Sequence, residues 1–283
     1  MQTNNTLDFD RPMLRMGSVA FLAGIIIFMI STIGFHAGTM DPMDNPAVFA
    51  VYAQSDPWIA AHIGQFAGLM LIYAGGFVAL HRLLLDSESG VASALAWFGL
   101  AAAIITASTY AILQAVDGIA QKIATGSWYA IPPSSTAGSE EEKAIAFRVA
   151  EGIRWTEIGI NSYNRILQGV VALIFGVAIT KSALLSRWIG AVGIIAGVIT
   201  LAAGVVVAYV GFSSVRDPVT DLSTFTLYPW IVILGIFMWR KTTAKKMMST
   251  RRTCYVISNS RLWVLFCQML CLQEYNNNDN IAD

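Results

Sequence analysis

The sequence predicts an all-α fold, a polytopic membrane helix bundle with six transmembrane helices and both termini in the cytoplasm. Of the 283 residues, 55% are hydrophobic and only 13% are charged, whereas about a quarter of an average soluble domain is charged. The apolar residues gather in long runs, each close to the roughly 20 residues that cross a hydrocarbon core of about 30 Å. A soluble core helix would instead keep one polar face for water.

Composition divides the chain into three parts. Residues 1–13 are polar and predict a disordered N-terminal tail. Residues 14–241 hold the long apolar runs and form the predicted six-helix transmembrane domain. Residues 242–283 are predicted to be a basic, partly disordered C-terminal tail, whose apolar run 262–272 is too short to cross a bilayer. This tail holds every cysteine of the chain, so no disulfide is expected in the transmembrane domain.

Six apolar runs are long enough to be read as spans. The first is too long for the h-region of a signal peptide, so it is predicted to be a retained helix. The sixth is the shortest and contains Pro229. Five spans are expected at residues 14–35, 57–80, 91–113, 184–212 and 224–239, and the fourth lies within the stretch 151–180, with Asn161 at its outer end.

Three connections between the spans have a recognisable character. The first, 37–56, contains a short apolar stretch at 46–54 that predicts a helix lying on the membrane surface. The second, 118–138, contains tryptophan, tyrosine and a Pro-Pro pair and predicts a loop at the membrane interface. The third, 213–223, predicts a loop before the sixth span. The first two loops are placed where they can cover a site.

A capping-box pattern marks the start of the fourth helix, because Glu142 follows Ser139 by three residues. An unbroken helix from there to Thr180 would be about 60 Å long. Such a helix must either project from the membrane or bend, and Gly152 and Gly159 are the expected bend points.

Two spans carry rows of small residues, which are typical of close helix packing in membranes. In the second span these are Ala60, Gly64 and Gly68, and in the fifth they are Gly190, Gly193, Gly197 and Gly204. Such faces can pack within the chain. They can also hold it as an accessory subunit against a membrane-protein partner or in a homo-oligomer.

The distribution of Lys and Arg predicts the orientation. With six spans, both termini lie on one side of the membrane. That side would hold Arg11, Arg15, Arg82, Lys181, Arg187, Arg240, Lys241, Lys245, Lys246, Arg251 and Arg252, and the other Lys122, Lys143, Arg148, Arg154 and Arg216. The positive-inside rule therefore places both termini in the cytoplasm and the chain in the cell membrane.

Polar residues recur at one depth, near the outer end of four spans. They are His36, His62, Gln65, Gln114, Asp117, Glu157, Asn161 and Arg165. Polar groups at membrane depth are costly unless they face protein or water, so they indicate a functional site. The interpretation is an outward-facing pocket that binds a small polar molecule or ion. The alternative is structural, with Arg165 paired to Asp117 or Glu157 to hold helices together.

The same polar residues could instead support cofactor ligation or proton transfer. His36 and His62 could together ligate a haem or a metal in a redox or enzymatic subunit, although no C-x-x-C-H attachment motif is present. His62 with Asp117 could form a proton relay if their spans are adjacent. The formal net charge is zero, so charge suggests no nucleic-acid partner, and the lipid bilayer is the partner that composition predicts.

Four stretches resemble a broad set of uncharacterised bacterial and archaeal six-helix integral membrane proteins. The similarity extends over residues 14–240 and implies the six-helix fold without a transferable function. The stretches are W-I-x-x-H-x-x-Q at 58–65, Q-A-V-D-G-I-A at 114–120, the polar stripe at 157–168 and S-R-W-I-G at 186–190.

Overall fold

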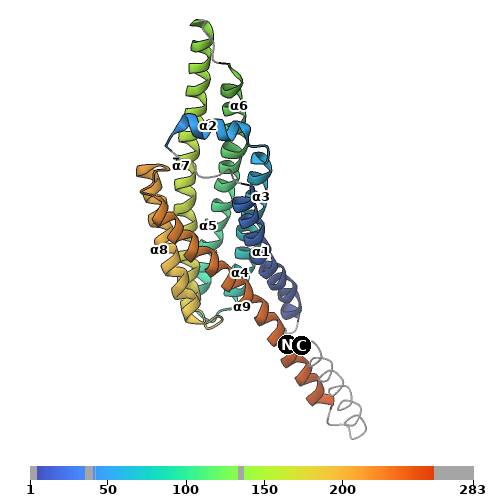
Figure 1. The fold of residues 1–283 in the computed structure, drawn as a ribbon. Coiled ribbons are helices and arrows are strands. Elements are labelled where there is room, and N and C mark those ends of the chain that lie inside the picture. The colour runs from blue at the N-terminus through green and yellow to red at the C-terminus, as the bar shows by residue number, and fades with distance from the viewer. Residues whose placement is uncertain (1–4, 36–40, 42, 133–136, 258–283) are drawn as a thin grey trace, which may run out of the picture. The chain divides into compact units, whose positions relative to one another are not determined.

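The computed structural model describes residues 5–35, 41, 43–132 and 137–257, and every regular element among them is a helix. The predicted all-α class is confirmed. Six helical segments are long and apolar enough to cross a membrane, as expected (Figure 1). They are Arg11–Ile33, Trp58–Leu85, Gly90–Ala130, Gly138–Lys181, Arg187–Val210 and Asp217–Thr242.

The described part of the chain contains eleven helical elements, of which all but the second contribute to these segments. α1 (Asn5–Phe35) is followed by the short α2 (Asn45–Gln54). The second span is α3 (Trp58–Met70), the π-helical turn η1 (Leu71–Gly76) and α4 (Phe77–Leu85); the third is α5 (Gly90–Gln114), the π-helical turn η2 (Ala115–Ala120) and α6 (Gln121–Ala130). The chain ends with α7 (Ala137–Lys181), α8 (Arg187–Val210) and α9 (Asp217–Ile257). Met1–Met238 form one compact unit and Trp239–Asp283 a second, in which the described residues continue α9.

Two predicted loops are wrong in large part. Most of the segment 118–138 is helical, because α6 continues to Ala130 and buries Ala124 beside Val48, Phe49 and Ala150. Tertiary packing thus overrides its turn-forming composition. The predicted loop 213–223 is also shortened, because α9 begins at Asp217. The next residue is a proline, which suits the first turn of a helix. The predicted surface helix at 46–54 is confirmed as α2.

α7 is a single helix of 45 residues, which corresponds to about 68 Å. It runs without interruption through Gly152 and Gly159, the two expected bend points. In Figure 1, α6 and α7 reach beyond the end of α8, and α2 lies across them. Phe49 of α2 fixes this arrangement, with ring centroids 6.1 Å from Trp128 of α6 and 5.4 Å from Phe147 of α7.

The predicted small-residue faces pack inside the chain. α7 and α8 cross at glycines on both helices. A Cβ on Gly197 would lie 2.8 Å from the Gly169 carbonyl oxygen, and one on Gly190 would lie 2.6 Å from that of Gly176. On α3, a Cβ on Gly68 would lie 2.7 Å from the carbonyl oxygen of Gly24 in α1. The glycines of these faces are therefore in contact with neighbouring helices of the same chain.

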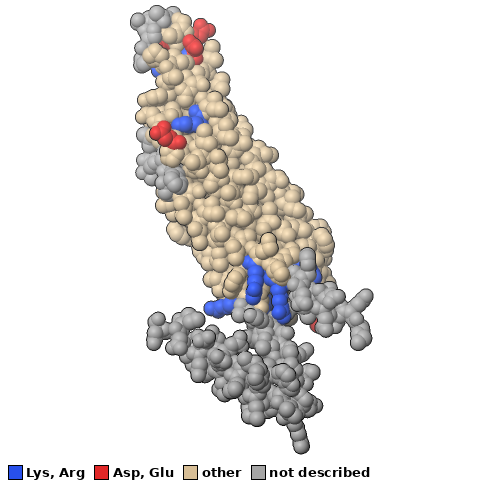
Figure 2. All heavy atoms as spheres, turned by 90° about the vertical axis from the view of Figure 1, so that its right-hand side faces the viewer, with Lys and Arg blue, Asp and Glu red and all other residues tan. Residues whose placement is uncertain are grey.

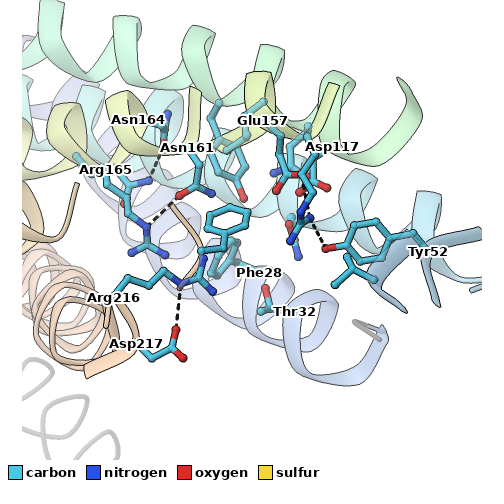
Figure 3. A pocket seen from close by; sticks show the side chains of 18 of the residues that line it. Phe28, Thr32, Tyr52, Asp117, Glu157, Asn161, Asn164, Arg165, Arg216 and Asp217 are labelled. Carbon is cyan, nitrogen blue, oxygen red and sulfur yellow. Dashed lines mark hydrogen bonds and ion pairs between the residues drawn. The ribbon is translucent and has the colours of Figure 1, made fainter. Parts of the chain in front are cut away.

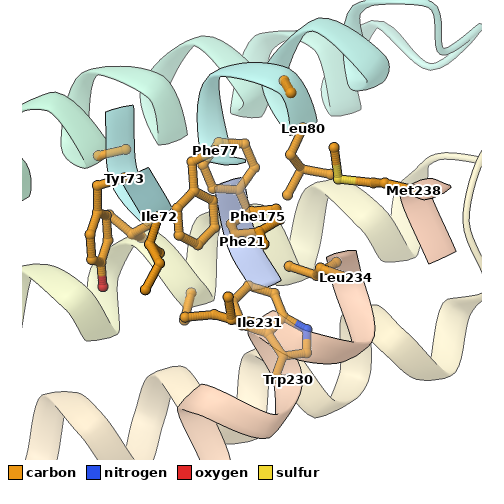
Figure 4. Close-up of a cluster of buried hydrophobic side chains, with 14 of the residues drawn as sticks. Phe21, Ile72, Tyr73, Phe77, Leu80, Phe175, Trp230, Ile231, Leu234 and Met238 are labelled. Atoms are coloured by element: carbon orange, nitrogen blue, oxygen red, sulfur yellow. The ribbon is translucent and has the colours of Figure 1, made fainter. Parts of the chain in front are cut away.

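Aromatic and aliphatic side chains fill one half of the bundle (Figure 4). Phe77 of α4 lies at the centre. Its ring centroid is 5.1 Å from those of Phe21 on α1 and Phe175 on α7, and 6.1 Å from that of Trp230 on α9. The indole Nε1 of Trp230 donates to the Ile189 carbonyl at 2.9 Å. This cluster closes the bundle on the side where α1 begins and α7 ends.

The outer surface agrees with a membrane setting. Figure 2 shows a broad band without Lys, Arg, Asp or Glu between charged side chains toward the two ends of that face. Large apolar side chains such as Ile26 and Ile195, each 58% exposed, lie on the surface. Lipid is the solvent in which such a surface is stable.

Candidate functional site

A polar cavity of about 570 Å³ lies in the half of the bundle away from the Phe77 cluster. α7 contributes the most residues to its wall. Phe28, Thr32, Val48, Val51, Tyr52, Gln65, Tyr110, Leu113, Gln114, Asp117, Arg154, Glu157, Asn161, Asn164, Arg165, Gln168, Phe212, Arg216, Asp217 and Tyr228 line it. The wall thus combines three arginines, three acidic residues and five side-chain amides.

Six of the eight residues predicted to share a site line this one cavity: Gln65, Gln114, Asp117, Glu157, Asn161 and Arg165. His62 lies directly behind Asp117, with its Nε2 3.0 Å from the Asp117 Oδ2. His36 lies outside the described residues. The predicted polar groups of three spans therefore converge, and their ligand-binding role remains a prediction.

Helical spacing explains how α7 builds its side of the cavity. Residues three, four and seven apart share one face of a helix. On α7 that face carries Arg154, Glu157, Asn161, Asn164, Arg165 and Gln168. Asn164 and Gln168 lie deepest, where Gln168 Nε2 donates to Asn164 Oδ1 at 2.6 Å, and Asn164 Nδ2 donates to the Thr106 carbonyl at 3.1 Å.

The π-helical turn η2 sets the position of Asp117. Such turns are rare and occur frequently at functional sites. At Gly118 the absence of a side chain lets α3 approach, because a Cβ there would lie 2.5 Å from the Cβ of His62. Trp58, which is fully buried, donates from Nε1 to the Asp117 carbonyl at 3.0 Å. The two spans are therefore adjacent, as a His62–Asp117 relay requires.

The contacts of His62 favour a proton on the His62–Asp117 pair. His62 Nδ1 is 2.7 Å from the Trp58 carbonyl oxygen, which can only accept, so Nδ1 carries a hydrogen. A neutral imidazole would then have a lone pair on Nε2 facing the Asp117 carboxylate at 3.0 Å. Because that arrangement is repulsive, the contact favours one proton on the pair, on either the nitrogen or the oxygen. In both placements the pair as a whole is neutral.

Arg154 is held by aromatic rings and by a carboxylate. Its Nη1 donates to the Tyr52 hydroxyl at 2.9 Å and lies 3.6 Å from Glu157 Oε2. Its guanidinium is 5.5 Å from the Tyr52 ring and 5.4 Å from the Phe212 ring. Burial raises the pKa of the Tyr52 hydroxyl above its ordinary value, and the nearby Glu157 carboxylate adds to the shift. Tyr52 therefore stays protonated.

Arg165 of α7 and Arg216, in the turn before α9, reach into another part of the cavity (Figure 3). Arg165 donates from Nε to Asn161 Oδ1 at 3.1 Å, and no described carboxylate lies within ion-pair distance of it. The predicted pairing of Arg165 with Asp117 or Glu157 is therefore wrong. Arg216 donates from Nε to Asp217 Oδ1 at 3.0 Å and stacks 4.2 Å from the Phe212 ring.

α2 covers the cavity and is tied down at both of its ends. At the N-terminus Asn45 Nδ2 donates to Glu151 Oε1 of α7 at 3.3 Å. At the C-terminus Lys122 of α6 donates from Nζ to the carbonyl oxygens of Tyr52, Ala53 and Ser55 at 2.9, 2.8 and 2.8 Å. One ammonium thus satisfies carbonyls that a helix end leaves without partners.

The proposed histidine ligation finds no support in the described residues. No group of three or more His, Cys, Asp or Glu side chains there is arranged to hold a metal ion. Both ring nitrogens of His62 already face partners, at 2.7 and 3.0 Å. His62 would have to give up one of them to ligate a haem or metal.

The fold and the cavity define a class: an all-helical protein with six helices able to cross a membrane and a charged cavity between them. The family model described as "Domain of unknown function (DUF4386)" matches residues 16–241, and the chain belongs to this family. No curated protein and no solved structure matches the chain.

Proposed function

We propose that the chain is a multi-pass protein of the cell membrane that binds a small polar molecule or ion in this cavity, in a transport-like or sensing role. The observation that carries the proposal is the concentration of charge in the cavity wall. Three arginines and three acidic residues line about 570 Å³, within the range of about 300–1,000 Å³ that small-molecule sites occupy. Ionisable groups inside a membrane bundle indicate function.

Unpaired polar atoms support the same proposal. Asp117 Oδ1, Glu157 Oε2, Gln114 Oε1 and Thr32 Oγ1 are buried without a hydrogen-bond partner among the described residues. All four belong to side chains that line the cavity. A purely structural polar cluster would be expected to satisfy its members, because an unsatisfied buried group costs about 1–3 kcal/mol. A polar ligand would supply the missing partners.

The orientation is part of the proposal. Arg82, Lys181 and Arg187 lie in or beside the short connections at the end of the bundle away from the cavity. The positive-inside rule makes that end cytoplasmic, so both termini are cytoplasmic and the cavity faces outward. The Phe77 cluster then separates the cavity from the cytoplasm.

A ligand screen with a matched pair of variants tests the proposal. Neutral, anionic and cationic polar compounds are screened by thermal shift on the full-length protein in detergent, and hits are measured by calorimetry. Val51→Trp fills the cavity from α2, whereas Gln54→Trp adds the same ring to the exposed end of that helix. Hits should bind the wild type and Gln54→Trp, and Val51→Trp should weaken them. No hit, or hits indifferent to Val51→Trp, would refute the proposal.

Transport and sensing separate in proteoliposomes. A transporter should accumulate or exchange the labelled hit across the bilayer, and Val51→Trp should abolish that flux. A sensor should bind the hit with the same dependence on Val51 and carry no flux.

A further inference from the structure

We infer that the ligand is a monocarboxylate that carries hydroxyl groups several bonds away from its carboxyl group. The inference rests on the proposed function and names the ligand class of the same cavity. The juxtaposition that carries it is an uncompensated guanidinium at one end of the cavity and unpaired acceptor oxygens at the other.

Charge accounting sets the charge of the ligand. Among the described residues that line the cavity, Arg154 is paired with Glu157, and Arg216 with Asp217. Asp117 faces His62, with its Oδ2 3.0 Å from the His62 Nε2. Arg165 is left with only the neutral amide of Asn161. Arg165 is therefore the described lining cation without a carboxylate within ion-pair distance, and one carboxylate on the ligand would give it a partner.

Geometry favours a carboxylate at the arginine end. Arg165 and Arg216 each engage a protein partner through Nε, which leaves the terminal amino groups of both guanidiniums for other partners. A guanidinium presents these donors as a planar fork that matches the two oxygens of a carboxylate. In Figure 3 both side chains point into the same part of the cavity.

At the opposite end of the cavity, acceptor oxygens lack hydrogen-bond donors. Asp117 Oδ1 has no hydrogen-bond partner among the described residues and can only accept when ionised, and the amide oxygen of Gln114 also lacks a partner. Gln114 and Glu157 are 6% and 3% exposed, so bulk water is largely excluded. Hydroxyl groups supply donors without adding the positive charge that an ammonium would bring.

Helix geometry sets the length of the ligand. Glu157 and Arg165 are eight residues apart on α7, which separates their Cα atoms by about 12 Å. A two-carbon hydroxy acid is too short to reach both ends. A chain of five or six carbons with hydroxyls at its far end meets both sets of partners.

Four probes and two arginine variants test the inference by calorimetry on the full-length protein. Gluconate has both features, hexanoate lacks the hydroxyls, sorbitol lacks the carboxylate, and inorganic phosphate carries more charge. Gluconate should bind the wild type about tenfold or more tightly than each of the others. Arg165→Gln should weaken gluconate by about tenfold or more and leave sorbitol unchanged. Arg148→Gln, on an exposed turn of the same helix, should change neither.

Arg165→Lys provides a second test if Arg165→Gln does not fold, because it keeps the charge and loses the fork. It should bind gluconate more weakly than the wild type does and still prefer it to sorbitol. Sorbitol or phosphate binding as tightly as gluconate, failure of gluconate to bind, or gluconate binding that ignores both variants overturns the inference. The proposed function fails separately, only if no compound of any charge binds in a way that depends on Val51.

Discussion

Replacing Lys122 with methionine tests whether α2 is a cover held in place by one side chain. The variant keeps the apolar stem and removes the ammonium that donates to the carbonyl oxygens of Tyr52, Ala53 and Ser55 at 2.8–2.9 Å. A hydrogen bond to a charged group contributes about 1.5–3 kcal/mol. Water can replace part of this at a helix end, so we expect α2 to lose about 2–4 kcal/mol of local stability.

Hydrogen exchange measures this loss directly. Because each 1.4 kcal/mol is a factor of ten, amides of α2 should exchange about 30- to 1,000-fold faster in the folded variant. Lys143→Met is the matched control, since Lys143 donates to a single carbonyl, that of Ile131, at 2.9 Å and does not touch α2. If the amides of α2 exchange at the same rate in Lys122→Met as in the wild type, Lys122 does not hold α2 in place.

Two further predictions concern the fold around the cavity. Asp117→Asn should cost less than about 1 kcal/mol, because the amide can donate to the Nε2 of His62, whereas Asp117→Leu leaves that nitrogen unsatisfied and should cost about 3 kcal/mol. Equal losses in denaturant titrations would contradict the shared proton. Gly193→Ala should lower stability by about 1–3 kcal/mol, because the new Cβ would lie 2.6 Å from the Trp230 ring. Gly152→Ala, in open space on a helix, should instead add up to about 1 kcal/mol, and thermal unfolding that ranks the two alike would refute the packing.

The fold was predictable because its signals are local. Spans follow from apolar runs of sufficient length, and the glycine row of α8 follows from spacings of three, four and seven residues on one helix. Loop boundaries were less predictable. The turn-forming residues after Gly118 lie in a helix because α6 packs on α2 and α7 at Phe49 and Ala124, and no local pattern announces such long-range contacts.

The site shows the same division. Gln114, Asp117 and the α7 stripe could be identified because helical spacing puts them on common faces at one depth. Asn164 could have been found by the same rule, since it lies three residues after Asn161. Arg216 and Asp217 could not, because they stand in a segment predicted to be a loop, and their place in the wall depends on where α9 begins.

Tyr52 and Lys122 were hidden for a related reason. Each acts through a partner far away in the sequence, Tyr52 through Arg154 and Lys122 through the end of α2. The pairing of Arg165 was mispredicted because several carboxylates were within reach by depth alone. Only the packed structure shows that Glu157 lies beside Arg154 and Asp117 beside His62.

The most direct measurement is the labelling of a single cysteine placed in the cavity. In a variant with Cys254, Cys267 and Cys271 replaced by serine, Asn161→Cys puts a thiol in the cavity wall. An outward-facing cavity predicts that a membrane-impermeant maleimide labels this thiol from outside in sealed right-side-out vesicles.

Two control positions calibrate the measurement in the same cysteine-free background. Ile195→Cys, on the apolar surface of α8, should resist the reagent from both sides. Arg187→Cys, at the end of the bundle away from the cavity, should react only after permeabilisation. Labelling of the Asn161→Cys thiol only after permeabilisation, or not at all, would contradict an outward-facing polar cavity.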